Sequence, residues 1–227
     1  MIQLLHAITC FSILAGALTP LAAATARDTH KQTTQEPEQT NESGLMVGQR
    51  APVSGVYFAC GEWAKHSKMT CPAAARGSEP KIAIYAMALD EPVIALARAV
   101  DQCIGEDAAL RWSFLSISDS KGGQEIQGSE SNYTREQREQ RLNELKQSAA
   151  DNGIEHLTIG LTRNSATQER QKLKLGEEHN VVVAFLDRVD GSSRRVKFAR
   201  SMRSADLTEQ NIAELIGELQ QLRPKAN

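Results

Sequence analysis

Cysteines are the residues of this chain whose type and spacing best suit chemistry. Cys60 and Cys71 flank a segment of ten residues that contains turn-forming residues and shows no clear period. In an oxidising compartment, a disulfide between them would close this short loop and stabilise the fold by about 2–3 kcal/mol. We therefore predict a structural disulfide. The alternatives are two free thiols, or an exposed and reducible bridge that takes part in thiol exchange.

Cys103 follows Val100 by three residues on the apolar face of a predicted helix. A free cysteine on such a face behaves as a small hydrophobic residue, so we predict that Cys103 is buried; the alternative is a resolving thiol. Cys60, His66 and Cys71 offer three side chains of the kind that bind metals, but their spacing matches no standard zinc motif and no fourth ligand is indicated. We predict no metal site and no cofactor, and retain metal handling as an alternative.

Several other function classes find no support in the sequence. It has neither the G-x-S-x-G turn of acyl-transfer enzymes nor the G-x-x-x-x-G-K-[ST] loop that binds phosphates. A formal net charge of -2, with acidic and basic residues mixed along the chain, leaves no basic stripe for nucleic acid. The charge run from Arg135 to Arg141 is typical of a solvated helix face; a partner-binding surface is the alternative.

The first residues of the chain indicate export. Residues 1–26 contain an apolar run from Ile8 to Leu21, small residues after it, and no Asp, Glu, Lys or Arg. The run is shorter than the roughly 20 residues needed to span a bilayer. We therefore predict a signal peptide that is removed together with Cys10. The mature protein is expected to be periplasmic or secreted, with no membrane span.

The rest of the chain divides into three regions by composition. Residues 27–45 are polar with almost nothing apolar, which predicts a disordered tether. Residues 46–223 have the size of one domain, and residues 224–227 form a short tail.

Strands alternate with helices in the predicted domain. Lys81–Ala86 is an apolar strand bounded by Pro80, and the next helix begins with Asp90 as its N-cap and Pro92 in its first turn. Thr134 and Gln137 predict a capping box for a second helix, which Gly153 ends. The other expected elements are strands at Val53–Phe58, Trp112–Ile117 and His156–Leu161, a hairpin of Val181–Leu186 and Arg194–Ala199 around Asp190-Gly191, and a last helix capped by Asp206 with Glu209.

This order of elements implies parallel strands followed by an antiparallel edge, and it resembles the thioredoxin-like fold in its peroxiredoxin and thiol-oxidoreductase branch. The opening Val47-Gly48-Gln49-Arg50-Ala51-Pro52 is similar to the V-G-x-x-A-P start of that branch. The resemblance implies an α/β three-layer sandwich. Its central sheet is expected to be mixed and to end in a C-terminal β-hairpin and helix.

A closer resemblance is to secreted bacterial thioredoxin-like proteins of unassigned function, in which a C-x-x-C pair precedes the first core strand. Cys71-Pro72-Ala73-Ala74 stands in that place, so Ala74 replaces the second cysteine. The following Ile84-Tyr85-Ala86-Met87 and Pro92-Val93-Ile94-Ala95-Leu96 match the "IFAR…P…L" pattern of the group. The resemblance therefore implies a degenerate pair at Cys71 and Ala74.

Two further departures concern the redox site that the resemblance implies. Redox members carry a reactive cysteine where the first core helix starts, whereas Leu89 and Pro92 here have no group that ionises. Redox members also place a cis-proline before the hairpin, and Asn180 stands at that position. A non-proline cis bond costs roughly 2.5–4 kcal/mol, so we expect the docking feature to be lost.

These departures lead to one expected function and two alternatives. The chain is expected to be an exported thioredoxin-like domain without the redox site, which serves as a binding or structural module for an unidentified protein partner rather than as an enzyme. The main alternative is an atypical thiol–disulfide oxidoreductase that uses Cys71 with Cys60. The weaker alternative is a metal-handling protein.

Overall fold

A computed structural model describes residues 44–75, 79–118, 133–163, 171–189 and 193–223. All of them belong to one unit of the chain, residues 39–227. The predicted signal peptide, the predicted tether up to residue 43, the Asp190-Gly191 turn and the C-terminal tail lie outside the described residues. No helix in the described part of the chain is both long and apolar enough to cross a bilayer.

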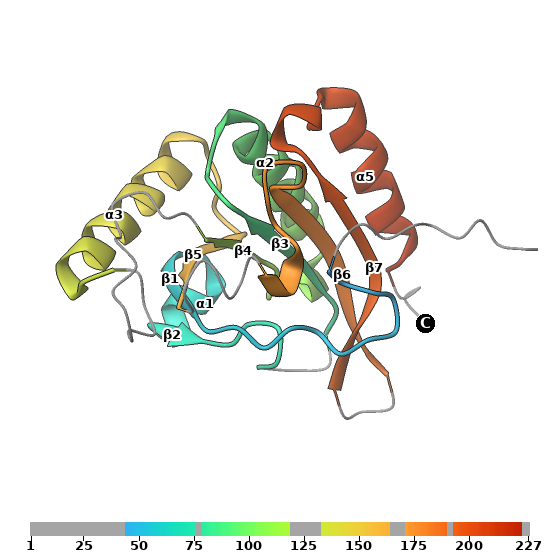
Figure 1. Ribbon diagram of the computed structural model, residues 1–227, viewed down its shortest axis with the longest axis horizontal. Coiled ribbons are helices and arrows are strands. Elements are labelled where there is room, and N and C mark those ends of the chain that lie inside the picture. Colours follow the sequence, from blue (N-terminus) through green and yellow to red (C-terminus); the bar gives the residue numbers. More distant parts are fainter. Residues whose placement is uncertain (1–43, 76–78, 119–132, 164–170, 190–192, 224–227) are drawn as a thin grey trace, which may run out of the picture. The chain divides into compact units, whose positions relative to one another are not determined.

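Seven strands form one mixed sheet in the order β2-β1-β5-β4-β3-β6-β7 (Figure 1). The central strands β3, β4 and β5 are parallel, while β6 and β7 extend one side and β1 and β2 the other by antiparallel pairing. The strands are β1 (Val56–Cys60), β2 (Met69–Thr70), β3 (Lys81–Ala86), β4 (Phe114–Ile117), β5 (Thr158–Thr162), β6 (Val181–Val189) and β7 (Ser193–Met202). This confirms the predicted parallel core with a C-terminal antiparallel hairpin.

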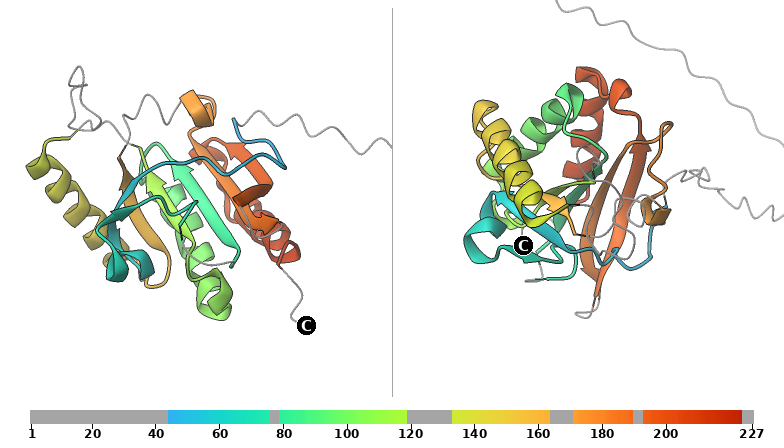
Figure 2. Two further views of the ribbon diagram at one scale, coloured as in Figure 1. Left: turned by 90° about the horizontal axis from the view of Figure 1, so that it is seen from below. Right: turned by 60° about the vertical axis from the view of Figure 1, so that its left-hand side comes forward.

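Helices cover one face of the sheet. They are α2 (Glu91–Glu106), α3 (Arg135–Asp151) and α5 (Glu209–Gln221), which lie side by side in Figure 2. Alternate residues of β3 supply the floor of this layer, because successive side chains of a strand point to opposite faces. Ile82, Ile84 and Ala86 pack against the helices, while Ala83 and Tyr85 face the other side.

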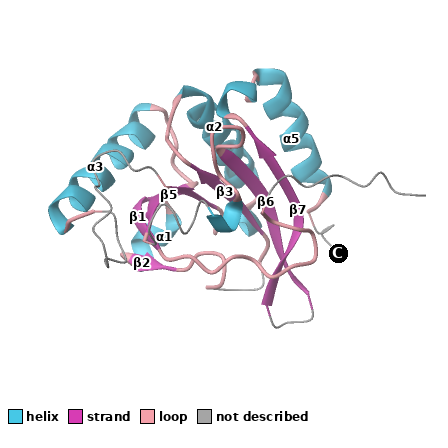
Figure 3. Ribbon diagram, in the orientation of Figure 1, coloured by secondary structure: helices cyan, strands magenta, loops and turns pink. Residues whose placement is uncertain are grey.

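The opposite face has a thinner cover, made by the short helix α1 (Glu62–His66), by a helical turn at residues 171–173 and by loops (Figure 3). Trp63 of α1 packs on Val56 and Phe58 of β1. Leu45 from the N-terminal loop and Leu173, at the end of a helical turn that precedes β6, also pack on the central strands. The sheet therefore lies between two layers, as expected for the predicted three-layer α/β sandwich.

The ends of α2 and α3 follow from their capping residues. Asp90 Oδ1 accepts a hydrogen bond from Val93 N at 3.1 Å, which confirms the predicted start of α2. Thr134 and Gln137 form the predicted capping box, with Gln137 N donating to Thr134 Oγ1 at 3.2 Å. After α3, Gly153 has a φ of 65°, a left-handed conformation that glycine adopts without strain.

The start of α5 differs from the prediction. Thr208 is its N-cap, because Thr208 Oγ1 accepts a hydrogen bond from Asn211 N at 3.2 Å. Asp206 forms an ion pair with Arg203 at 2.9 Å and does not cap the helix. The predicted cap was wrong by two residues. Asp206 and Thr208 both precede the helix, but the carboxylate of Asp206 is bound by Arg203, so Thr208 caps the helix.

The start of β1, the start of the packed domain and two short elements differ from what the sequence indicated. β1 begins at Val56 rather than Val53, and the segment after it contains α1 and β2, which were not predicted because both are very short. The packed domain begins before residue 46, since Leu45 is only 2% exposed and Gly44 N donates to Leu173 O at 3.3 Å.

One outer strand of the sheet is short, and the other is partly covered along its outer side. β2 has only two residues. The outer side of β7 is covered by residues 48–51: Gly48 N donates to Val196 O at 2.8 Å, and Ala51 N donates to Arg194 O at 2.9 Å. The N-terminal segment of the domain therefore covers the first part of the edge that β7 would otherwise expose.

Candidate functional site

The turn that starts α2 lies beside the residue that precedes β6. Met87 N donates a hydrogen bond to Asn180 O at 3.0 Å, at the end of β3 where Ala86 pairs with Val181. Leu89 is partly buried against the core between the sheet and the helices. The structure thus brings the turn that leads from β3 into α2, which contains Leu89, into contact with Asn180 through Met87.

The side chain of Asn180 has a structural role. Its Nδ2 donates to Ser204 Oγ at 3.1 Å, and its Oδ1 accepts from Ser204 N at 2.6 Å. Ser204 lies after β7, so these two bonds join the start of β6 to the turn that leads into α5. Peptide bonds are all trans in the described segments.

The strand order and this juxtaposition together define the fold. A parallel β3–α2–β4 unit is followed by the antiparallel β6–β7 hairpin and a terminal helix, and α2 starts opposite the beginning of β6. The fold is thioredoxin-like.

Two solved structures are similar to this thioredoxin-like chain. A peroxiredoxin-like protein from Aquifex aeolicus has 13% sequence identity and a TM-score of 0.47, covering 77% of this chain and 88% of that chain. A thiol peroxidase from Chromobacterium violaceum has 14% identity and a TM-score of 0.43, covering 78% of this chain and 88% of that chain. No protein-family model and no curated protein matches the sequence.

The two cysteines of the predicted disulfide lie far apart in this thioredoxin-like domain. Val56 pairs with Thr70 across the β1–β2 hairpin, so Cys71 lies opposite Gly55, whereas Cys60 is at the other end of β1. Five strand residues correspond to about 16 Å, and a disulfide needs Cα atoms roughly 4.4–6.8 Å apart. Both residues are free thiols in the structure. The prediction treated the segment between them as a closed loop, but hairpin pairing directs its two ends apart.

The remaining thiol and the possible metal ligands occupy ordinary structural positions. Cys103 is 4% exposed, which confirms its predicted burial. Burial raises the pKa of both Cys103 and Cys60. His66 Nε2 lies 3.0 Å from Glu62 Oε1, and the described residues contain no group of three or more metal-binding side chains. Cys60, His66 and Cys71 therefore do not converge.

Lys81 is a buried cation that the sequence analysis did not single out. It is 0% exposed, its Nζ donates to Pro72 O at 2.7 Å and to Ala75 O at 2.5 Å, and it lies 4.6 Å from the centre of the Trp63 ring. Burial, with a smaller contribution from the charge of Arg194, lowers the pKa of Lys81 to about 7. Its place at the start of an apolar strand gave no signal of this environment.

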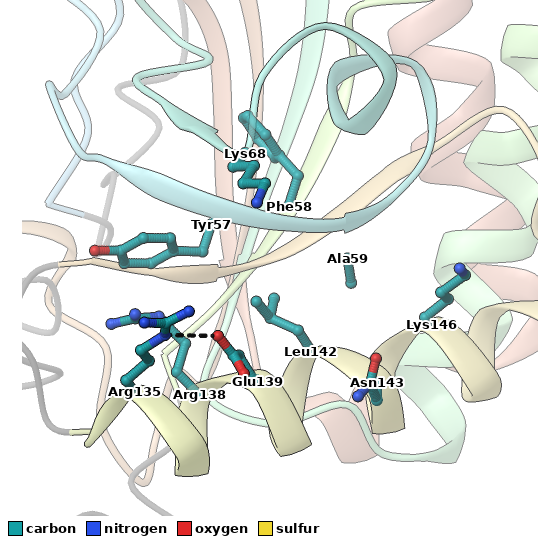
Figure 4. A pocket seen from close by; sticks show the side chains of 10 residues that line it. All are labelled: Tyr57, Phe58, Ala59, Lys68, Arg135, Arg138, Glu139, Leu142, Asn143 and Lys146. Atoms are coloured by element: carbon teal, nitrogen blue, oxygen red, sulfur yellow. Dashed lines mark hydrogen bonds and ion pairs between the residues drawn. The ribbon is translucent and has the colours of Figure 1, made fainter.

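A groove between α3 and β1 is the cavity with the most distinctive charge. Its volume is about 580 Å³, and Figure 4 shows its lining side chains. The side chains of Val56 and Phe58 point away from α3. The intervening Tyr57 and the following Ala59 therefore point toward α3 and line the groove on its β1 side. A register shift between Phe58 and Cys60 marks a bulge at Ala59.

The groove exists because the side chains of α3 that face the sheet change from apolar to charged toward the N-terminus of the helix. Leu145 and Ala149 are buried, and Leu142 is partly buried against the same core. Arg138 occupies the next inward position, where its guanidinium lies 4.4 Å from the centre of the Tyr57 ring. An arginine cannot bury itself as a leucine does, so this half of the helix leaves an open groove over β1.

Positive charge dominates the groove. Its lining includes one carboxylate, Glu139, which is paired with Arg135 at 3.0 Å. Lys68, Arg138 and Lys146 also line it, and within the described ranges none of these three pairs with a carboxylate. The sequence analysis had considered the Arg135–Arg141 run as a partner-binding surface only as the alternative to a solvated face. Nothing in that run indicates which of its cations faces the sheet.

Proposed function

We propose that this chain is an exported thioredoxin-like binding module that does not catalyse thiol–disulfide exchange. The observation that carries the proposal is the start of α2. There Asp90 caps the helix by accepting a hydrogen bond from Val93 N, and Leu89 packs against the core. The side chain of Asn180 is hydrogen-bonded to Ser204. Each group at the position of a redox site thus has a structural task, and none can supply a thiolate.

The location of the cysteines supports the same proposal. Cys71 immediately precedes Pro72, whose carbonyl binds Lys81 at the start of β3, whereas α2 begins beyond the other end of that strand. Cys60 is separated from Cys71 by the hairpin register and has a raised pKa, which disfavours the reactive thiolate. An attacking thiol and a resolving thiol are therefore not paired.

Reduction of insulin by dithiothreitol tests the proposal. The mature protein and a Cys60→Ser/Cys71→Ser variant are expected to give the same rate of turbidity as buffer alone. A rate well above that of the double variant would overturn the proposal and favour an oxidoreductase that uses these cysteines.

Export is the second part of the proposal and rests on residues 1–26. The intact mass of protein recovered from the periplasm or medium of an expressing bacterium is expected to match cleavage after Ala24 or Ala26. Recovery of the uncleaved chain from the cytoplasm alone would contradict it.

A further inference from the structure

The groove between α3 and β1 suggests what the binding module takes as its partner. Arg135 and Arg138 lie at one end of the groove and Lys146 at the other, with Leu142 and Ala59 between them (Figure 4). Arg135 is already paired with Glu139, so the free cations of the two ends are Arg138 and Lys146, which are eight residues apart on one helix. At 1.5 Å per residue their Cα atoms are separated by about 12 Å along the axis.

This distance sets the length of the occupant. An extended peptide rises about 3.3 Å per residue, so the first and last residues of a segment of about five residues lie opposite these two cations. A single small carboxylate cannot engage both ends at once. The volume of about 580 Å³ is also sufficient for several side chains.

The lining sets the chemistry of the occupant. Arg138, Lys68 and Lys146 have no carboxylate partner within the described ranges, although the whole chain has a formal net charge of -2. A local excess of unpaired cations attracts negatively charged groups, even in a weakly acidic protein. Because these cations lie at separate ends of the groove, they favour a partner that carries two separated carboxylates over a single small anion. The apolar middle, at Leu142 and Ala59, suits an apolar side chain.

We propose that the groove between α3 and β1 binds an extended segment of a partner protein, about five residues long, with an acidic side chain near each end and an apolar side chain between them. The inference rests on the proposed role as a binding module and names the partner's chemistry. Arg138 then has two tasks. It covers the Tyr57 ring in the free protein and pairs with a partner carboxylate in the complex.

An NMR titration of the ¹⁵N-labelled mature chain tests this inference. The probe is the peptide acetyl-Glu-Ser-Leu-Ser-Glu-amide, and the comparison peptide has glutamine in place of both glutamates. We expect saturable amide shifts around Tyr57, Ala59 and Leu142 with the acidic peptide. We expect affinity at least tenfold weaker with the glutamine peptide, and loss of binding as salt rises.

Charge-reversal variants give the matched comparison. Arg138→Glu/Lys146→Glu is expected to abolish the shifts, whereas Lys197→Glu, an equal change per site at an exposed position of β7, is expected to leave them intact. The dispersion of each spectrum reports whether the variant is folded, and Arg138→Gln provides a milder change should the double variant unfold.

Several results would overturn the inference. They are equal binding of the two peptides, shifts outside the groove, an equal loss in Lys197→Glu, no saturable binding, or binding of free glutarate as tight as that of the peptide. None of these would alter the insulin result, so failure of the groove and failure of the non-redox proposal are distinguishable.

Discussion

A Lys81→Met replacement should remove a pH dependence of stability that the unaltered domain shows above neutrality. The pKa of Lys81 is lowered from 10.5 to about 7 in the folded protein, because the ammonium group is buried. In the unfolded chain the amine regains its ordinary pKa. Between these two values the unfolded state therefore binds one more proton than the folded state, and the free energy of unfolding rises with pH.

The magnitude follows from the two pKa values. The slope approaches about 1.4 kcal/mol per pH unit once the folded amine is neutral. Since the slope is half of that at the folded pKa, the gain between pH 7 and pH 9 is about 2 kcal/mol. Below pH 7 the full cost of burying the charge remains, and above the unfolded pKa the gain is complete.

Urea unfolding from pH 6.5 to 9.5, in the presence of a reductant, measures this gain. Lys197→Met removes the same charge from an exposed position and is expected to keep the wild-type rise, while Lys81→Met is expected to lose it. Titration of Cys60 and Cys103 is common to all three proteins, so it cancels in the comparison. The absolute stability of Lys81→Met is not the readout, because methionine cannot donate to Pro72 O or Ala75 O. A Lys81→Met curve that rises as steeply as the wild type would refute the reasoning.

Three further predictions concern single features of the structure. Asn180→Ala removes both bonds to Ser204 and should lower the free energy of unfolding by about 2 kcal/mol, measured by urea unfolding; a loss no greater than that of Ser204→Ala would contradict the role of the paired bonds. Thr134→Ala breaks the capping box of α3 and should cost about 1 kcal/mol in the same assay, and an unchanged midpoint would show that the helix start is held by other contacts. Alkylation of the mature protein with N-ethylmaleimide in denaturant without reductant should modify Cys60, Cys71 and Cys103, as counted by intact mass, because none is bridged in the structure; a single modified cysteine would instead reveal the disulfide expected from the sequence.

The sequence was most informative where local chemistry alone determines an element. Lys81–Ala86 matches β3 because Pro80 limits it and every side chain in it is buried. The start of α2 depends on one hydrogen bond between Asp90 and Val93, which are three residues apart, and the capping box of α3 is equally local. Such features need no knowledge of the rest of the chain, so they are visible in the sequence.

Features that depend on tertiary pairing were not predictable in the same way. Cys60 and Cys71 are near in sequence, but the register of β1 with β2 separates them. The cap of α5 depends on which carboxylate Arg203 takes. The groove depends on a bulge at Ala59 and on Arg138 facing the sheet, whereas the sequence shows only alternating charges along α3.

The way residues 48–51 lie along β7 has a consequence for how the domain can be shortened. A chain that starts after Pro52 would leave a row of N–H and C=O groups of β7 without the partners it has in Gly48, Gln49 and Ala51. Bare outer strands of this kind pair readily with the same strand of a second molecule. Those few residues thus protect this part of β7 from self-association, and a shortened version of the domain keeps the protection only if it retains the chain from Gly48 onward.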